Sequence, residues 1–412
     1  MKEVRLHQFP WSVKEGELSL FFPDRWEVKV CEISGAKKQK LSQEEIRSRL
    51  SKPLSGSSIR EMARGKGEAV IIFDDMSRIT PVKEVLPFIL EELEAVGMTP
   101  KDITFVSALG AHGAMDRTDF VRKLGEEVVS NYPVYNHNPF DGCVCLGKTK
   151  NGTPLSFNQE VVEAGFKIGI GAIVPHLMTG LSGGGKILLP GVAAFETIEA
   201  FHRHGGRLKE RLSGGFVPQD LLKDNPLLED IEEAVFKVGL NLKVDVLLNA
   251  KGEICEIFVG HPAKIREMEV KEALFHYKAP AMEADIVVAN VFSKANEGEI
   301  GVVTCLSCVN KTGGDLVLIC NVKEGHVVHY LMGTFGRRSR TRLKLTVRTP
   351  DYVRNVLVFT EYPEESLRDY FEEPEKVLFF TRWEELLSFL EERYPGTATV
   401  AVYPSADIHY LC

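Results

Sequence analysis

The sequence predicts an α/β protein with two α/β domains, each built on a mostly parallel sheet, and an active site in the cleft between them. The length of 412 residues, at roughly 150 residues per domain, indicates two or three domains. Short unbroken apolar runs such as residues 70–73 are typical of parallel strands buried on both faces. These runs alternate with amphipathic helical segments, and such alternation indicates open parallel sheets. We place the domain boundary near residue 272, which divides the chain into residues 1–272 and 273–412.

The predicted elements of the N-terminal domain follow from apolar periodicity and from capping residues. Ser42 is the expected N-cap of one helix, and Thr80 and Pro81 are the expected N-cap and first residue of another. The predicted strands are residues 18–23, 26–33, 70–73, 102–110 and 166–174, and the predicted helices are residues 42–50, 80–97, 194–208 and 261–277.

The C-terminal domain repeats the alternation of apolar strands and helices. Its predicted strands are residues 284–292, 314–322, 355–360, 376–380 and 397–404, with a helix over residues 382–396 before the last of them. Polar residues near the strand ends of this half, including Lys294, Asn296 and Glu299, are expected to face the first domain across a cleft, where ligands commonly bind.

Composition limits the class of partner and the location. A net charge of −8 argues against a nucleic-acid partner, and no apolar run reaches the roughly 20 residues of a membrane span. The first residues carry no apolar stretch typical of a signal peptide, so we expect a cytoplasmic protein. Cys305 and Cys308 form a C-x-x-C without the second pair that a structural zinc site needs, and we expect plain thiols there.

Three polar clusters fall where three predicted strands end. The first runs from Asp74 and Asp75 to Arg78, and the others are His112 and His176. Ligands of open parallel sheets bind beyond the carboxyl ends of the strands, so the sequence predicts one crevice that holds all three clusters. Arg78, just before a helix, suits an anion such as a phosphate or carboxylate; the alternative is an Asp–Arg pair beside an N-cap.

A glycine-rich loop, "GLSGGGKILLPG", nearly matches a nucleotide-binding P-loop. Gly180, Gly185 and Lys186 have the spacing G-x-x-x-x-G-K, but Ile187 replaces the hydroxyl residue that holds magnesium. Pro190 would also end the helix that a P-loop requires. We therefore exclude a nucleotide triphosphatase. The consecutive glycines allow the backbone to approach a ligand closely, although a tight turn is the alternative.

The histidines suggest acid–base chemistry or a metal. His112 and His176, at the ends of strands that point into one crevice, suit an acid and a base on opposite faces of a small substrate, because the pKa of imidazole lies near neutrality. His202 and His204 are two residues apart on a helix and do not share a face, so at most one is a ligand of the site. For any one histidine, a structural role in the core or on the surface remains the alternative.

With these residues assembled, the chain resembles the lactate racemase family, whose members use a nickel-pincer nucleotide. The resemblance rests on "DDMSRITP", "GAHGAM", "NHNPFD" and "PHLMTGLSGGGKILLPGVAAFETIEAFHRHG", and it covers most of residues 70–210. It implies that Lys186 bears the cofactor covalently and that His202 coordinates its nickel. It further implies that Asp75, Ser77 and Arg78 hold the nucleotide part, and that His112 and His176 are the acid and base.

The implied reaction is racemisation or epimerisation of a 2-hydroxy acid. One histidine removes the hydroxyl proton as the carbinol hydrogen leaves as hydride to the pincer, and hydride return to the other face inverts the centre. The implied partners are the substrate and the enzymes that make the cofactor. Ser77, Ile79 and Gly113 depart from the family's motifs, and the glutamine and lysine that hold lactate in the second domain have no match. We therefore expect a larger or more polar 2-hydroxy acid, with Lys294 as a candidate for binding its carboxylate.

Two other functions remain open from the sequence. A non-catalytic protein of the same fold would bind a hydroxy acid or a nucleotide without turnover. A zinc- or iron-dependent hydrolase would use His176 and His202 as metal ligands and would carry no adduct on Lys186.

Overall fold

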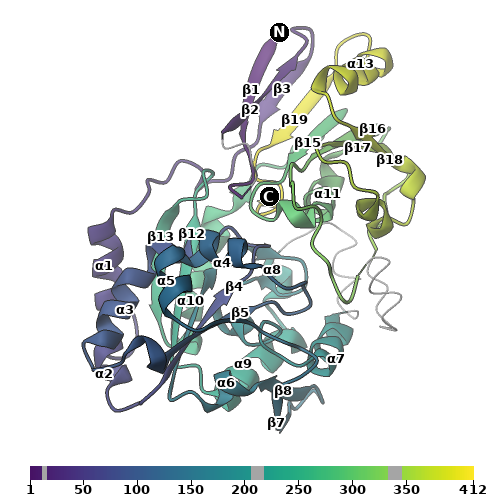
Figure 1. The fold of residues 1–412 in the computed structure, drawn as a ribbon. Helices are drawn as coiled ribbons and strands as arrows, with labels where there is room; N and C mark the ends of the chain where they lie inside the picture. The colour runs from purple at the N-terminus through teal and green to yellow at the C-terminus, as the bar shows by residue number, and fades with distance from the viewer. Residues whose placement is uncertain (12–15, 206–217, 333–345) are drawn as a thin grey trace.

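A computed structural model describes residues 1–11, 16–205, 218–332 and 346–412. The described residues form two bodies, each around a six-stranded, mostly parallel sheet, and helices flank both sheets (Figure 1). The predicted fold class is therefore confirmed. None of the helices in the described residues combines the length and apolar character that a bilayer crossing needs. The cytoplasmic location stays a prediction.

The first sheet has the strand order β13-β12-β9-β4-β5-β6, and all neighbouring pairs are parallel except β12 with β13. Its strands are β4 (Ala69–Asp74), β5 (Ile103–Ala108), β6 (Val134–Asn136), β9 (Phe166–Ala172), β12 (Leu242–Leu248) and β13 (Ile254–Gly260). All seven residues of β9 are buried, as its unbroken apolar pattern predicts for a central strand. The carboxyl ends of β4, β5 and β9 therefore open at one edge.

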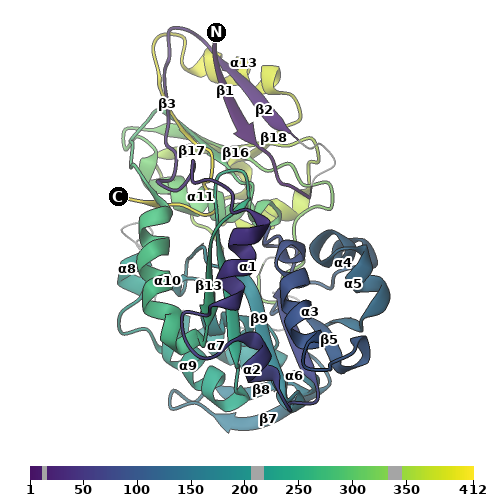
Figure 2. The same ribbon diagram turned by 90° about the vertical axis from the view of Figure 1, so that its left-hand side faces the viewer.

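Helices cover both faces of this sheet. Figure 2 shows α1 (Gln43–Ser51) and α3 (Leu86–Glu94) side by side, and α7 (Phe195–Gly205) packs with α9 (Pro226–Val238) elsewhere on the same body. Further helices are α2 (Ile59–Ala63), α4 (Arg117–Leu124), α5 (Glu126–Asn131), α6 (Gln159–Glu163), α8 (Pro218–Leu221) and α10 (Pro262–His276). Residues 206–208, the end of the predicted helix over 194–208, lie outside the described residues.

One predicted cap is confirmed and one is wrong. Ser42 caps α1: its hydroxyl accepts the amide of Glu45, whose carboxylate accepts the amide of Ser42. Thr80 caps no helix, because its hydroxyl donates to the carboxylate of Asp74. The chain instead passes through the short 3₁₀ turn Val82–Glu84 before α3 begins at Leu86.

The second sheet is parallel throughout, with the order β18-β17-β16-β15-β19-β3. Its strands are β3 (Glu27–Val30), β15 (Ile286–Asn290), β16 (Gly314–Ile319), β17 (Val353–Phe359), β18 (Val377–Phe380) and β19 (Thr399–Tyr403), and α11 (Glu299–Cys305) and α13 (Trp383–Arg393) are its helices. The strands predicted for the C-terminal half are all present.

The N-terminal strands associate with this second sheet. β3 pairs with β19, and the hairpin of β1 (Lys2–His7) and β2 (Glu17–Phe22) lies beside them (Figure 1). Trp26 and Phe22 are fully buried in a cluster that includes Ile286 and Val288 of β15. The strands β1, β2 and β3 and Trp26 thus associate with the C-terminal sheet, and the boundary near residue 272 stays a prediction.

The buried indole of Trp26 should be important for the stability of this second core. We expect Trp26→Ala to lower the free energy of unfolding by about 3–5 kcal/mol, because it leaves a large cavity. Urea denaturation followed by circular dichroism measures this change. Phe21→Ala is the matched control, since Phe21 is exposed on β2, and it should change stability by less than about 0.5 kcal/mol. Equal losses in the two variants would contradict the packing described.

Candidate active site

One pocket at the carboxyl ends of β4, β5 and β9 contains the acid–base, cofactor and metal candidates predicted from the sequence, but not Lys294, the candidate for binding the substrate carboxylate. The residues that line it include Asp75, Ser77, Arg78, His112, His176, Lys186 and His202. Parallel strands bring their carboxyl ends to one edge, and this explains why segments more than a hundred residues apart meet there. The predicted convergence of the three polar clusters is confirmed.

Asp75 holds the loop after β4 and orients His112. Its Oδ1 accepts the amide and hydroxyl of Ser77 at 2.9 and 2.5 Å, and its Oδ2 lies 2.6 Å from Nδ1 of His112. Burial acts to raise the pKa of Asp75, but His112 and the Ser77 hydroxyl hold it below its usual value. Burial likewise acts to lower the pKa of His112, but Asp75 raises it above its usual value. His112 therefore favours its protonated form.

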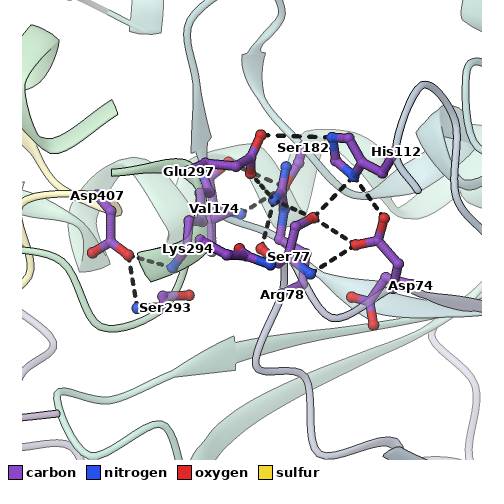
Figure 3. A network of polar contacts seen from close by, with 12 residues as sticks. Asp74, Ser77, Arg78, His112, Val174, Ser182, Ser293, Lys294, Glu297 and Asp407 are labelled. Atoms are coloured by element: carbon purple, nitrogen blue, oxygen red, sulfur yellow. Dashed lines mark hydrogen bonds and ion pairs between the residues drawn. The ribbon is translucent and has the colours of Figure 1, made fainter. Parts of the chain in front are cut away.

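Arg78 forms an ion pair across the cleft (Figure 3). Its guanidinium donates to Oε2 of Glu297 at 2.7 Å, and Oε1 of Glu297 lies 3.6 Å from Nε2 of His112. Burial would raise the pKa of Glu297, but Arg78 and His112 lower it to about 2. The partner of Arg78 in this protein is thus a carboxylate of the C-terminal half, and not an aspartate of its own loop.

His176 follows β9 and is held by the turn after it. Its Nδ1 lies 3.1 Å from the hydroxyl of Thr179 and 3.2 Å from the amide nitrogen of Met178. Burial, and then the nearby Lys186, lower its pKa well below the usual value, so the neutral ring is favoured. Across the cleft, Nζ of Lys294 donates to the carbonyl of Pro175 at 2.8 Å. His112 and His176 therefore have opposite pKa shifts in one pocket.

The glycine-rich loop turns tightly and presents Lys186 to the pocket. Gly183 and Gly184 have φ of 79° and 56°, values that favour glycine. The amide of Gly184 donates to Oδ2 of Asp245 at 2.6 Å, so a carboxylate of the protein occupies the place that a phosphate takes in a P-loop. Nζ of Lys186 lies 3.3 Å from the Thr179 hydroxyl. Burial, and then Arg78, lower the pKa of Lys186 well below its usual value, which favours a neutral, nucleophilic amine.

His202 has one ring nitrogen available for a metal. Its Nδ1 donates to the carbonyl of Ile198 at 2.7 Å, which leaves Nε2 with its lone pair. Burial lowers the pKa of His202 to about 4, so the ring is neutral. His204 does not line the pocket, as the helical spacing predicts. Among the described residues, no group of three or more His, Cys, Asp or Glu side chains could hold a metal ion.

Four polar residues of the pocket were missed by the sequence analysis. Lys243 and Asp245 lie on β12, which was not among the predicted strands, and form a buried ion pair of 2.6 Å. Glu297 and His329 come from the C-terminal half. The stretch that contains Glu297 had been expected to face the cleft, whereas His329 lies in a loop without a periodic pattern.

The three residues expected to face the first domain, Lys294, Asn296 and Glu299, differ in the half of the chain that they contact. Lys294 reaches Pro175, and the amide of Asn296 lies 3.5 Å from the carbonyl of Met76. Glu299 instead pairs with His326 of its own half at 2.7 Å. None of the three lines the pocket.

The cysteines form no disulfide, and the absence of a metal at the C-x-x-C stays a prediction. All eight are free, and both members of the C-x-x-C are buried. The sulfur of Cys308 lies 3.0 Å from the hydroxyl of Tyr403, and that of Cys305 lies 3.8 Å from Nε2 of His409.

Comparison with known proteins supports the resemblance inferred from the motifs. Residues 13–212 match the lactate racemase N-terminal domain. A lactate racemase of Thermoanaerobacterium thermosaccharolyticum is 26% identical over 305 residues, covering 71% of this chain and 69% of the relative. A lactate racemase of Lactiplantibacillus plantarum is 27% identical over 304 residues, covering 70% and 68%.

Solved structures share the fold of the whole chain. The lactate racemase apoprotein of Thermoanaerobacterium thermosaccharolyticum has a TM-score of 0.75 at 21% identity, with both chains fully covered. A protein of Thermotoga maritima has a TM-score of 0.68 at 16% identity, covering 90% of this chain and 99% of that one.

The fold, the pocket and the relatives define a two-domain α/β enzyme of the isomerase class. Its sequence is similar to that of members of the lactate racemase family over about 70% of the chain.

The Asp75–His112 pair makes stability depend on pH. Because the pKa of His112 is raised by folding, its charged form stabilises the fold fully below about pH 6.5, and this contribution is lost as the pH rises through the folded pKa. We expect Asp75→Asn to cost about 3–5 kcal/mol at pH 6 and less at pH 9, as measured by urea denaturation. The control is Glu324→Gln, which removes a surface ion pair with Arg122 and should cost about the same at both pH values. A loss that is equal at both pH values would contradict the assignment.

Proposed function

We propose that this protein is a racemase or epimerase that inverts the C2 centre of a 2-hydroxy acid, with a nickel-pincer nucleotide bound covalently to Lys186. One observation carries the proposal: a single pocket combines a lysine that favours its neutral form, two histidines with opposite pKa shifts, and a third histidine with a free Nε2. The relatives named lactate racemase support the reaction type.

The residues present fit the proposed cofactor. A neutral Lys186 amine suits a covalent link to a thioacid group, and Nε2 of His202 suits nickel because the Ile198 carbonyl fixes the ring. Asp75, Ser77 and Arg78 form the loop that would hold the nucleotide part. Gly171 leaves room beside the pocket, since a side chain there would lie 3.4 Å from the carboxylate of Asp74 and the amine of Lys243. When bound, this cofactor accepts a hydride from the substrate carbon and returns it.

The two histidines supply the proton transfers in this proposal. His176, whose neutral ring is favoured, is the base for the hydroxyl proton of the substrate. His112, protonated and held through Nδ1 by Asp75, is the acid that gives a proton from Nε2 to the oxygen after inversion. In the reverse direction the two roles exchange. Such help is worth roughly 10²–10⁴-fold in rate per group.

The chain's own residues support a substrate other than lactate. Gly113 stands where an arginine is frequent in the family, and a Cβ at this position would lie 3.3 Å from Val328. The C-terminal half presents Glu297 and His329 to the pocket, and the glutamine and lysine of lactate-type enzymes have no match in this sequence. The proposal also implies cofactor-making enzymes as partners in the same, cytoplasmic compartment.

Loading of the cofactor tests this proposal. When the protein is produced with the cofactor-making enzymes, intact-mass measurement should show an adduct and metal analysis should show nickel. Lys186→Ala should carry no adduct, and Lys186→Arg, which keeps a long basic side chain but has no primary amine, should carry none either. His202→Ala should keep the adduct but bind nickel at least about tenfold more weakly.

Turnover completes the test. Chiral chromatography should show that the loaded protein interconverts the two enantiomers of at least one 2-hydroxy acid. Protein that carries neither adduct nor nickel under these conditions would refute the proposal.

A further inference from the structure

The C-terminal half closes the pocket with two polar side chains. Among the described residues of that half, Glu297 and His329 are the ones that line the pocket. We call this pair the polar wall. Both members lie against His112, which the proposed function makes one of the two proton-transferring groups. The wall is therefore close to the reacting carbon.

Glu297 offers a hydrogen-bond acceptor to the pocket. It belongs to the 3₁₀ turn Ala295–Glu297 and is 7% exposed. Its Oε2 binds Arg78, whereas its Oε1 lies 3.6 Å from Nε2 of His112, beyond ordinary hydrogen-bond length. A carboxylate oxygen in this position retains the capacity to accept a hydrogen bond from a ligand.

His329 offers a donor. Its backbone pairs with that of His112 across the cleft, and hydrogen bonds of 2.8 and 2.9 Å flank the pair. The two rings meet edge to face with centroids 5.2 Å apart. Nδ1 of His329 accepts the amide of Leu331 at 3.1 Å, so in the neutral ring Nε2 carries the hydrogen. Burial, and then protonated His112, favour that neutral ring.

A hydroxyl is the small group that satisfies both members of the wall. It donates to a carboxylate and accepts from an imidazole N–H, whereas a methyl group does neither. A second carboxylate would be repelled by Glu297, and an ammonium cannot accept from His329. Two basic residues that line the pocket, Arg78 and Lys243, are already paired with Glu297 and Asp245, which further disfavours a dianionic substrate.

We propose that Glu297 and His329 select 2-hydroxy acids that carry another hydroxyl on the carbon next to the reacting one. This inference rests on the proposed racemase function and names the substrate class of the same site. Both wall residues contact His112, which reprotonates the C2 oxygen in the proposed reaction, so a hydroxyl bound by the wall is assigned to the adjacent carbon.

A panel of matched three- and four-carbon acids tests the wall. Glycerate and lactate differ by one hydroxyl at C3, isoserine carries an amine there, and malate carries a carboxylate beyond it. With protein shown by intact mass to carry the adduct, we expect kcat/KM for glycerate to exceed that for each of the others by at least about tenfold. Calorimetric binding of glycerate and lactate to the loaded protein should show the same preference.

Variants of the wall separate its role from general damage. His329→Phe keeps a ring but removes the N–H, and we expect the glycerate-to-lactate ratio of kcat/KM to fall about tenfold, the loss of roughly one hydrogen bond. Glu297→Gln weakens the acceptor and should also lower the ratio. Glu324→Gln makes the same chemical change on the surface of the same half and should keep the wild-type ratio.

The outcomes distinguish this inference from the proposed function. If loaded wild-type protein has the same kcat/KM for lactate or malate as for glycerate, the proposed selectivity of the polar wall is wrong. The proposal is also contradicted if His329→Phe and Glu297→Gln both keep the wild-type glycerate-to-lactate ratio of kcat/KM. This comparison uses variants that retain the adduct and the wild-type circular dichroism spectrum. Absence of adduct and nickel in the wild type refutes the proposed function instead.

Discussion

Two carboxylates, Asp75 and Glu297, determine which basic groups of the pocket keep their charge. Arg78, His112, His176 and Lys186 line one pocket and are only partly exposed to solvent, where isolated charges are costly. Asp75 pairs with His112 and Glu297 pairs with Arg78, so these two groups stay protonated. His176 and Lys186 form no ion pair with a carboxylate among the described residues, and their pKa values fall. The pocket thus holds an acid, a base and a nucleophile together.

This pattern of charge depends on both halves of the chain. Glu297 comes from the second sheet's side of the cleft, whereas Arg78 and His112 come from loops of the first sheet. Lys294 likewise crosses the cleft to the carbonyl that precedes His176, and its burial, followed by Arg78, lowers its own pKa to about 7. Separation of the two halves would leave Arg78 without its carboxylate. The protonation states that the proposed reaction needs therefore depend on contacts between the two halves of the chain.

Much of this arrangement was predictable from local patterns, and the failures have physical reasons. Asp75, His112 and His176 were predicted to meet because each follows a buried strand, and parallel strands end at one edge. His202 was separated from His204 by helical periodicity. Glu297 and His329 escaped prediction because they lie on a short turn and a loop, whose positions depend on contacts across the cleft. The pairing of β3 with β19 could not be predicted from the sequence either, because an apolar strand pattern does not identify the neighbouring strand in the sheet.

The central claim is that the hydrogen on C2 and the hydroxyl proton of the substrate are transferred to different groups. The hydrogen on C2 goes to the cofactor as hydride and returns from it, and the proton is transferred by His112 and His176. Turnover of one enantiomer by the loaded protein in deuterium oxide, followed by mass spectrometry and proton NMR of the product, tests this claim most directly. The account predicts that the product of opposite configuration retains its original hydrogen at C2, because only the hydroxyl hydrogen exchanges with solvent. Deuterium at C2 of the inverted product would contradict the account and would indicate removal of the C2 hydrogen as a proton.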